Sequence, residues 1–457
     1  MKIALHILGI NLAKFTAYLS QAFNLGSGTS LPGMLAQKVS PDLFSYLVSQ
    51  TKKDIIFVTG TNGKTTTSGL LAGILKADNR KIAHNRKGAN MLTGLITALS
   101  QESSIFGNLN VDNCLLEIDE AYLPVITAKA DPNIVVLTNL FRDQLDRYGE
   151  LDTTAKKVYA GIEKIKNKKD LCIIVNADDP ITSGVAEKTN VKKLYFGIDN
   201  IVFSNNQDIS ESQKEITTCK CGKNYMYSKI VYSHLGHYHC ECGNKRPEPD
   251  IIATQVEIGI ESSTITVKSN EHEFSYKLHL PGLYNVYNSL CAISTALTLG
   301  IAPKTIVNGI ENYSTVFGRA ETLKINNKDV LIQLIKNPVG ATEVLKTVNN
   351  DPNSKLIIAI NDNYADGRDV SWLWDAGFEL LKNYQKEIIC SGHRAYDMAV
   401  RLKYAGVNTK LISVEEDIKT AIEKHVRSLS ENEKLYILPT YTVLLDMQLF
   451  LPKMINK

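Results

Sequence analysis

The sequence contains no long apolar run, almost no net charge and few cysteines for its length of 457 residues. No run approaches the roughly 20 apolar residues that a membrane-spanning helix needs, so we expect no transmembrane segment. His6, Asn11 and Lys14 interrupt the apolar start of the chain, and no small-residue cleavage site follows them, which argues against a signal peptide. The net charge of +3, from 51 basic and 48 acidic residues, gives no reason to expect nucleic acid as a partner.

The cysteines are too sparse for a disulfide scaffold. Four of the eight stand in apolar surroundings, which is typical of reduced core residues: Cys114, Cys172, Cys291 and Cys390. The composition, with 44% hydrophobic and 22% charged residues, also excludes disordered, collagen-like and coiled-coil proteins. The sequence therefore predicts a soluble, cytoplasmic protein of several domains.

Short β-branched runs alternate with amphipathic stretches along most of the chain. Runs such as Ile55–Val58 and Ile134–Leu137 are apolar on both faces, as buried parallel strands are, so we expect an α/β fold. We expect a helical lead-in over residues 1–50, a central domain over 51–316 and a Rossmann-like α/β domain over 317–457. The strands predicted for the last domain are Val330–Ile335, Leu356–Ile360, Glu387–Cys390, Lys410–Val414 and Lys434–Leu438.

The strongest chemical signal is the segment TGTNGKTTT, which lies between a buried strand and an amphipathic helix. Glycines let successive backbone N–H groups turn toward a phosphate, and the helix N-terminus adds positive potential. Lys64 would reach the β- and γ-phosphates of a nucleotide, and the Thr65 hydroxyl would hold Mg²⁺. Val58 replaces the first glycine of the general P-loop pattern, and the alternative is a glycine-rich turn with a solvated lysine. The predicted ATP-binding residues of this loop are Gly60, Thr61, Asn62, Gly63, Lys64, Thr65 and Thr66.

Five further segments follow the P-loop at intervals: LEIDE at 116–120, TNLFRDQLD at 138–146, NADDP at 176–180, GLYNVYN at 282–288 and FGRAE at 317–321. Together with the P-loop they resemble the family of Mur ligases and folylpolyglutamate synthases, which form amide bonds through an acyl-phosphate. The resemblance implies ATP and Mg²⁺ as cofactors, with Glu117 as a catalytic Mg²⁺ ligand beside Lys64. It also implies nucleotide contacts from Asn176, Asp178, Asn285 and Arg319. Gln144 and Tyr284 stand where the family usually has histidine.

Two C-x-C pairs lie in a polar stretch that differs in texture from the rest of the chain. Cys219, Cys221, Cys240 and Cys242 have the clustering of a structural four-cysteine zinc ribbon, which we expect as an insertion over about 205–250. Each knuckle is one residue shorter than the usual C-x-x-C. Three histidines lie close enough to replace a cysteine ligand: His234, His237 and His239. A metal-free loop is the alternative.

The second α/β unit carries a dense polar and aromatic segment, NDNYADGRDVSWLWD at 361–375, directly after an expected strand. Functional side chains of open α/β sheets lie at the carboxyl ends of strands. The alternative is that these residues serve in caps and Asx turns. Cys390 and His393 are too poorly placed to form a cysteine glutaminase, because Cys390 ends an apolar strand.

The short lead-in, the cysteine insertion and this segment together resemble the MurT family of ligase subunits of lipid II isoglutaminyl synthases. The resemblance implies ATP-dependent amidation of D-glutamate in the stem peptide of lipid II, at the membrane surface. Ammonia would come from a GatD-type glutaminase in a heterodimer, whose Cys–His pair is completed by Asp362 or Asp366. We favour Asp362 because it lies at the strand end. Alternatives are a folylpolyglutamate synthase-like ligase without a partner and a non-catalytic nucleotide-binding scaffold.

Overall fold

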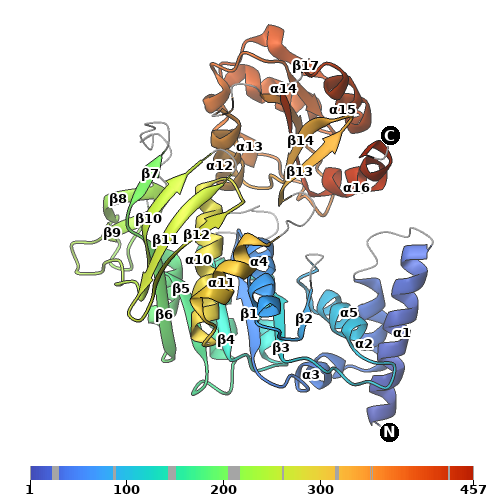
Figure 1. The fold of residues 1–457 in the computed structure, drawn as a ribbon, viewed down its shortest axis with the longest axis vertical. Coiled ribbons are helices and arrows are strands. Elements are labelled where there is room, and N and C mark those ends of the chain that lie inside the picture. The colour runs from blue at the N-terminus through green and yellow to red at the C-terminus, as the bar shows by residue number, and fades with distance from the viewer. Residues whose placement is uncertain are drawn as a thin grey trace.

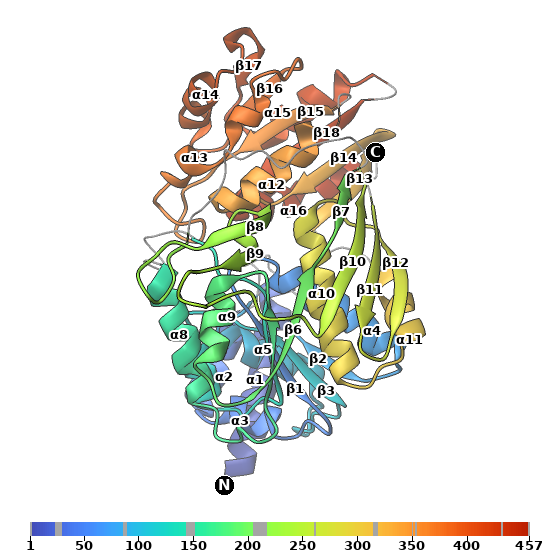
Figure 2. The same cartoon turned by 90° about the vertical axis from the view of Figure 1, so that its left-hand side faces the viewer.

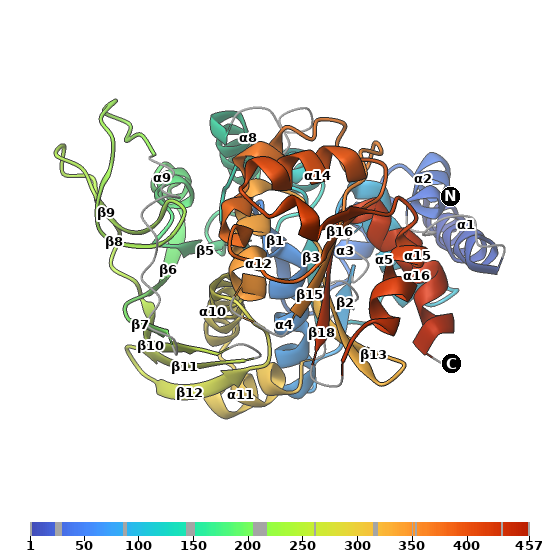
Figure 3. The same ribbon diagram turned by 90° about the horizontal axis from the view of Figure 1, so that it is seen from above.

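The computed structural model describes residues 2–22, 30–85, 89–142, 151–203, 217–259, 262–313, 319–349, 351, 354–430 and 433–455. A large central α/β unit carries a smaller C-terminal α/β unit above it (Figure 1). The N-terminal helices and the hairpin of β8 (Met226–Tyr232) and β9 (Leu235–His239) lie at opposite edges of the central unit (Figures 1 and 3). Residues 314–318, where we expect the boundary between the two units, are outside the described ranges.

Three helices form the N-terminal region: α1 (Lys2–Ala22), α2 (Leu31–Val39) and α3 (Leu43–Val48). They pack with α5 (Leu92–Glu102) around Ile10, Ala36 and Leu43, all fully buried. Among the described residues, only α1, over Lys2–Ser20, has the length and apolar character of a membrane span. This helix is a candidate span by length and composition only, and its inner face packs against protein, so the expectation of no transmembrane segment stays a prediction.

A ten-stranded sheet forms the central unit, in the order β12-β11-β10-β6-β5-β4-β1-β3-β2, with β7 pairing β10. The strands from β1 to β6 run parallel, because each is followed by a crossover that returns the chain to the same edge. The ten strands of this sheet are β1 Ile55–Thr59, β2 Ile82–His84, β3 Asn113–Glu117, β4 Ile134–Leu137, β5 Cys172–Asn176, β6 Lys192–Ile198, β7 Ile201–Phe203, β10 Ile251–Ile258, β11 Ser263–Ser269 and β12 Glu273–Leu278.

Helices cover both faces of this sheet, which explains why its strands are apolar on both sides. One face packs against α4 (Lys64–Ala77), α10 (Leu283–Thr298) and α11 (Pro303–Glu311). The other packs against α3, α5, α6 (Leu123–Thr127), α8 (Leu151–Glu163) and α9 (Pro180–Glu187).

Only part of the polar stretch around the cysteines lies outside this sheet. The hairpin of β8 (Met226–Tyr232) and β9 (Leu235–His239) forms a separate two-stranded sheet (Figure 2). The antiparallel strands β10 to β12 instead extend the central sheet, because β10 pairs in parallel with β6. Residues 204–216, the start of the expected insertion, lie outside the described residues.

The C-terminal unit has a six-stranded sheet in the order β13-β14-β18-β15-β16-β17, parallel except for β13. All five strands predicted for this region are present. The strands are β13 Arg319–Ile325, β14 Lys328–Gln333, β15 Ser354–Ala359, β16 Ile388–Ser391, β17 Ile412–Val414 and β18 Lys434–Pro439. The helical elements are α12 Pro338–Asn349, α13 Trp372–Asp375, η2 Phe378–Leu381, α14 Ala395–Tyr404, η3 Thr409–Leu411, α15 Ile418–Arg427 and α16 Tyr441–Ile455.

Candidate active site

The predicted P-loop connects β1 to the N-terminus of α4. Gly60 and Gly63 have φ values of +129° and +83°, which side chains with a Cβ rarely adopt. A Cβ at Gly63 would lie 1.9 Å from Oδ1 of Asn288, so this glycine also lets α10 approach the loop. The tight turn directs the start of α4 at the space in front of the loop, as a phosphate site requires.

The TN segment after β4 holds this loop in shape. The Asn62 backbone N–H donates to Oδ1 of Asn139 at 2.9 Å, and Nδ2 of Asn139 donates to the Asn62 carbonyl at 3.1 Å. The Thr138 hydroxyl donates to the same carbonyl at 2.8 Å. These residues therefore position the loop, and the rest of the segment, 143–146, is outside the described residues.

A buried cluster of opposite charges lies between the loop and the end of β3. Lys64 Nζ is 3.0 Å from Oε2 of Glu120, and the Thr65 hydroxyl donates to Oε2 of Glu117 at 2.8 Å. Burial disfavours the charge of Lys64, but the carboxylates of Glu120, Asp119 and Glu117 outweigh it and raise the pKa of Lys64. Lys64 is thus a cation at neutral pH, and Thr65 and Glu117 together offer the oxygen ligands that Mg²⁺ prefers.

The NADD segment after β5 is packed inside the protein. Asn176 and Asp178 are both fully buried, and the Asn176 Nδ2 group has no hydrogen-bond partner within the described ranges. Asp178 accepts from Arg246 at 2.5 Å and from Tyr287 at 2.6 Å. Burial raises the pKa of Asp178, against the opposing effect of Arg246 and Tyr287. Asp178 therefore joins β5 to the segment after the cysteine cluster and to α10, while the adenine contacts of both residues stay predictions.

A cavity lies between the P-loop and the C-terminal unit, beside the points where the two are in contact. Its walls include Asn62, Gly63 and Asn288 on one side and Lys336 and Asn337 on the other. Predicted residues Thr66 and Asn285 also line it. The Arg319 side chain lies outside the described residues.

Several residues at the P-loop or in this cavity were not predicted from the sequence motifs. Glu120 belongs to the LEIDE segment at 116–120, but its ion pair with Lys64 was not predicted. Asn90 donates to Glu117 at 3.3 Å from the start of α5. Lys336 and Asn337 follow β14, and Asn337 donates to the Asn62 side chain at 2.9 Å. The strand-end rule applied to β14 was the one signal that could have found these last two.

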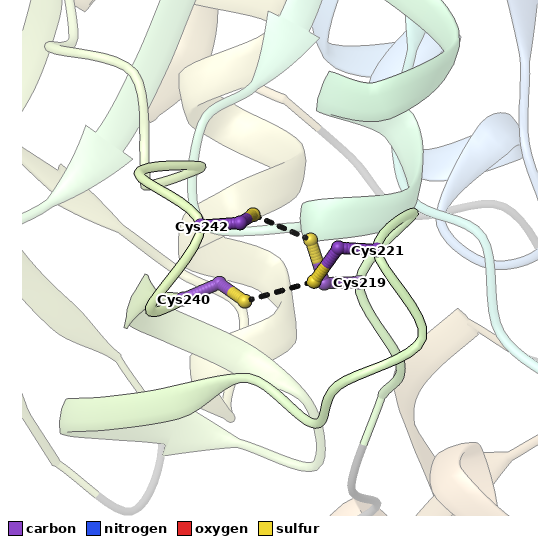
Figure 4. A group of neighbouring side chains, drawn as sticks. All are labelled: Cys219, Cys221, Cys240 and Cys242. Atoms are coloured by element: carbon purple, nitrogen blue, oxygen red, sulfur yellow. Dashed lines mark hydrogen bonds between the residues drawn. The ribbon is translucent and has the colours of Figure 1, made fainter.

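The four cysteines of the insertion converge, and their sulfur atoms all lie within 4.8 Å of one another (Figure 4). Cys219 and Cys242 are 3.6 Å apart and Cys221 and Cys240 are 3.5 Å apart, sulfur to sulfur. With metal–sulfur bonds of about 2.3 Å, tetrahedral geometry needs sulfur separations of about 3.8 Å, so the site fits a metal ion.

The short knuckles have matching backbone turns. Gly222 donates to the Cys219 carbonyl at 2.8 Å, and Gly243 donates to the Cys240 carbonyl at 2.9 Å. Both glycines have φ near +90°, at +84° and +90°, which allows the tight turn in place of a longer C-x-x-C loop.

Two of the three histidines that could have replaced a cysteine, His234 and His237, have other contacts. His234 is buried with its Nε2 3.3 Å from Asp179, and His237 lies 2.9 Å from the Ile198 carbonyl. The group of possible metal ligands contains cysteines alone.

The two candidate aspartates of the C-terminal segment have different surroundings. Asp362 is partly exposed, accepts from Arg394 at 2.7 Å and lies 3.6 Å from His393 Nδ1. Partial burial alone would raise the pKa of Asp362, but the Arg394 guanidinium outweighs it and holds that pKa below its usual value. Asp366 is buried and accepts from the Thr442 hydroxyl at 2.6 Å. Burial raises the pKa of Asp366 despite these bonds.

Cys390 is fully buried at the end of β16. Burial raises the pKa of its thiol to about 12, so it remains protonated and unreactive at neutral pH. This agrees with its predicted role as a core residue.

This fold and site define a Mur ligase-like enzyme. The Mur ligase middle domain family matches residues 58–241, and the MurT ligase C-terminal family matches 334–444. The pseudomurein peptide ligase type C from Methanothermus fervidus shares the fold, with a TM-score of 0.67 and 24% identity over 88% of this chain and 79% of that one. The folylpolyglutamate synthase of Mycobacterium tuberculosis superimposes with a TM-score of 0.60 and 14% identity, covering 89% of this chain and 94% of that one.

Two curated relatives are more similar in sequence. The chain is 37% identical to the lipid II isoglutaminyl synthase (glutamine-hydrolyzing) subunit MurT of Staphylococcus aureus (strain COL), over 96% of both chains. It is 35% identical to the subunit of the same name from Streptococcus pneumoniae (strain ATCC BAA-255 / R6), over 92% of both. The chain belongs to the MurT family.

Proposed function

We propose that this chain is the ligase subunit of a lipid II isoglutaminyl synthase and amidates the α-carboxylate of D-glutamate in the stem peptide. The observation that carries the proposal is the full-length similarity to MurT subunits, which extends over both the P-loop unit and the Asp362 segment. Two features support an ATP-dependent reaction: the buried Lys64 with its neighbouring carboxylates, and the cavity between the two units that the loop residues Asn62, Gly63 and Thr66 line.

A carboxylate does not react with ammonia directly, because its oxygen is a very poor leaving group. In the proposed reaction the carboxylate oxygen forms a bond to the γ-phosphorus of ATP and ADP leaves. Ammonia then attacks the acyl carbon and inorganic phosphate leaves. Catalysis of this kind consists of positioning and charge neutralisation. Lys64 and the loop N–H groups would hold the phosphates, and Thr65 and Glu117 would hold Mg²⁺.

The ammonia is proposed to come from a GatD-type glutaminase subunit. Cys390 is protonated and buried, and so gives this chain no glutaminase nucleophile at that position. Asp362 instead is partly exposed and contacts His393 and Arg394. Two exposed aromatic side chains lie within two residues of these groups in sequence, Tyr364 at 88% and Tyr396 at 64% exposure. A carboxylate held charged by Arg394 suits the role of orienting a histidine of the partner.

The deciding experiment is amidation of lipid II with ATP and Mg²⁺, followed by mass spectrometry. Product from ammonium with the chain alone, and from glutamine only with the glutaminase present, would support the proposal. No product under any condition, with ATP hydrolysed when soluble carboxylates and amino acids are offered, would contradict it. That outcome would favour the folylpolyglutamate synthase-like alternative.

We also propose that the cysteine cluster holds a structural zinc ion. The variant Cys240→Ser lacks one buried thiolate ligand. Its metal content, measured by plasma mass spectrometry, should therefore fall from about one zinc per chain to near zero. The melting temperature should fall by several degrees, since a lost ligand set destabilises the ribbon. Lys220→Ala, an exposed neighbour in the other knuckle, is the control and should change neither value. Wild-type protein without bound metal would contradict the proposal.

Lys336 supplies positive charge from the C-terminal side of the cavity. Its Nζ donates to the Thr61 carbonyl at 3.3 Å, so it faces the P-loop. We expect Lys336→Ala to lower kcat for amidation by about 10- to 100-fold, because one electrostatic contact to the transferred phosphate is lost. Lys336→Arg should retain more activity, and the exposed Lys410→Ala should behave as wild type. Wild-type kcat in Lys336→Ala would exclude the role.

A further inference from the structure

The N-terminal helix α1 exposes large apolar side chains on the face that points away from the protein. Ile3, Leu8, Phe15 and Tyr18 are 64%, 56%, 59% and 69% exposed. Leu8, Phe15 and Tyr18 recur at helical spacing, so they form one stripe along α1. The helix lies at the outer edge of the molecule (Figures 1 and 3).

The loop after α5 enlarges this stripe. Ile105 and Phe106 are 60% and 72% exposed. The loop is fixed against α1, because Nδ2 of Asn11 donates to the Ile105 carbonyl at 2.9 Å. We call the six residues Ile3, Leu8, Phe15, Tyr18, Ile105 and Phe106 the apolar face. An exposed cluster of this kind marks an interaction site.

The charges on the elements that carry the apolar face are mostly positive. Residues 1–41 contain Lys2, Lys14 and Lys38 and no aspartate or glutamate. Glu102, at the end of α5, is the acid that acts on Lys14. Apolar side chains flanked by lysines complement a bilayer that contains anionic phospholipid.

The opposite side of α1 decides between lying on a bilayer and spanning it. Ile10, Ala13 and Ala17 are at most 3% exposed and pack against α2 and α5. A spanning helix would have to lose these contacts, whereas a helix lying in the interface keeps them. About 31 Å of helix, at 1.5 Å per residue, is then available along the surface.

We propose that the apolar face is a membrane-docking surface, which seats α1 and the loop after α5 in the interface of an anionic bilayer. This goes beyond the proposed amidation, because the surface is on the far side of α1 from the P-loop unit and needs no lipid substrate. Docking would hold the whole chain at the bilayer, where a lipid-linked substrate is concentrated.

The test is flotation of the full chain with phospholipid vesicles that contain no lipid II. Wild type should float with vesicles of phosphatidylcholine and phosphatidylglycerol, less with phosphatidylcholine alone, and less at high salt. Phe15→Glu and Phe106→Glu should each weaken flotation about tenfold or more. Leu449→Glu, similarly exposed at 69% on α16, is the matched control and should float as wild type does.

Two further measurements keep the test decisive. Phe15→Trp should show a blue-shifted tryptophan emission with anionic vesicles, which reports burial without adding a charge. Light scattering in solution tests the competing occupant, a second copy of the chain. Wild type that does not float with either vesicle, or a dimer that Phe15→Glu dissociates without any flotation of wild type, would overturn the proposal. Amidation of lipid II in detergent should be unchanged in Phe106→Glu, so failure here is separable from failure of the proposed function.

Discussion

Replacing Lys64 by methionine should lower ammonium-dependent amidation at least about a thousandfold, because it removes the buried P-loop cation from the transferred phosphate, and Lys336 approaches only from the opposite side of the cavity. The same change leaves Glu120, which is 1% exposed, without its cation. An unpaired buried carboxylate costs about 3–5 kcal/mol, so Lys64→Met should also lower stability. Amidated product is measured by mass spectrometry, and stability by chemical unfolding.

The double variant Lys64→Met, Glu120→Gln separates the two effects. It removes both charges of the pair, so most of the lost stability should return while amidation stays absent. Lys53→Met changes an exposed lysine before β1 and should retain wild-type activity and stability. Amidation above about a tenth of the wild-type rate in the stable double variant would refute the phosphate role of Lys64.

Asp362→Asn should lower glutamine-dependent amidation about 10²- to 10⁴-fold in the complex with the glutaminase. An amide orients the partner's catalytic histidine poorly and does not stabilise its cation. Amidation from ammonium should stay within about twofold of wild type, since the charged partners of Asp362 are His393 and Arg394 of the C-terminal unit and not residues of the P-loop. The ratio of the two rates is the readout.

Its neighbours supply the controls. Asp369→Asn, in the same segment, should leave both reactions intact. Asp366→Asn weakens the bonds to Thr442 and should lower the melting temperature and both reactions together. Equal loss of both reactions in Asp362→Asn would show that Asp362 serves the fold and not the glutaminase.

Local patterns were enough to predict the parts of the fold that depend on neighbouring residues. The P-loop, the buried strand before it and the strands of the C-terminal unit follow from apolar runs and glycines within a few residues. The meeting of four cysteine sulfurs was also predictable, because two knuckles of matching spacing have few other uses in a chain without disulfides.

Long-range contacts decided what the sequence left open. The surroundings of Asp362 and Asp366 differ because the hydroxyl of Thr442, 76 residues after Asp366, donates to Asp366. His234 contacts Asp179, 55 residues earlier in the chain, and lies outside the cysteine cluster. Asp178 is fixed by Arg246 and Tyr287, and nothing in the NADD segment itself reports those partners.

The contacts of Asp178 connect the cysteine cluster to the P-loop. The backbone N–H of Arg246 donates to the carbonyl of Tyr238, next to the cysteine cluster. The Arg246 side chain donates to Oδ1 of Asp178, and the Tyr287 hydroxyl of α10 donates to Oδ2. The next residue along α10, Asn288, packs directly against Gly63. Oxidation of the exposed thiols of Cys221 and Cys242 should therefore disturb the residues that position the P-loop. The proposed ATP site would then be sensitive to oxidants that act on the protein surface.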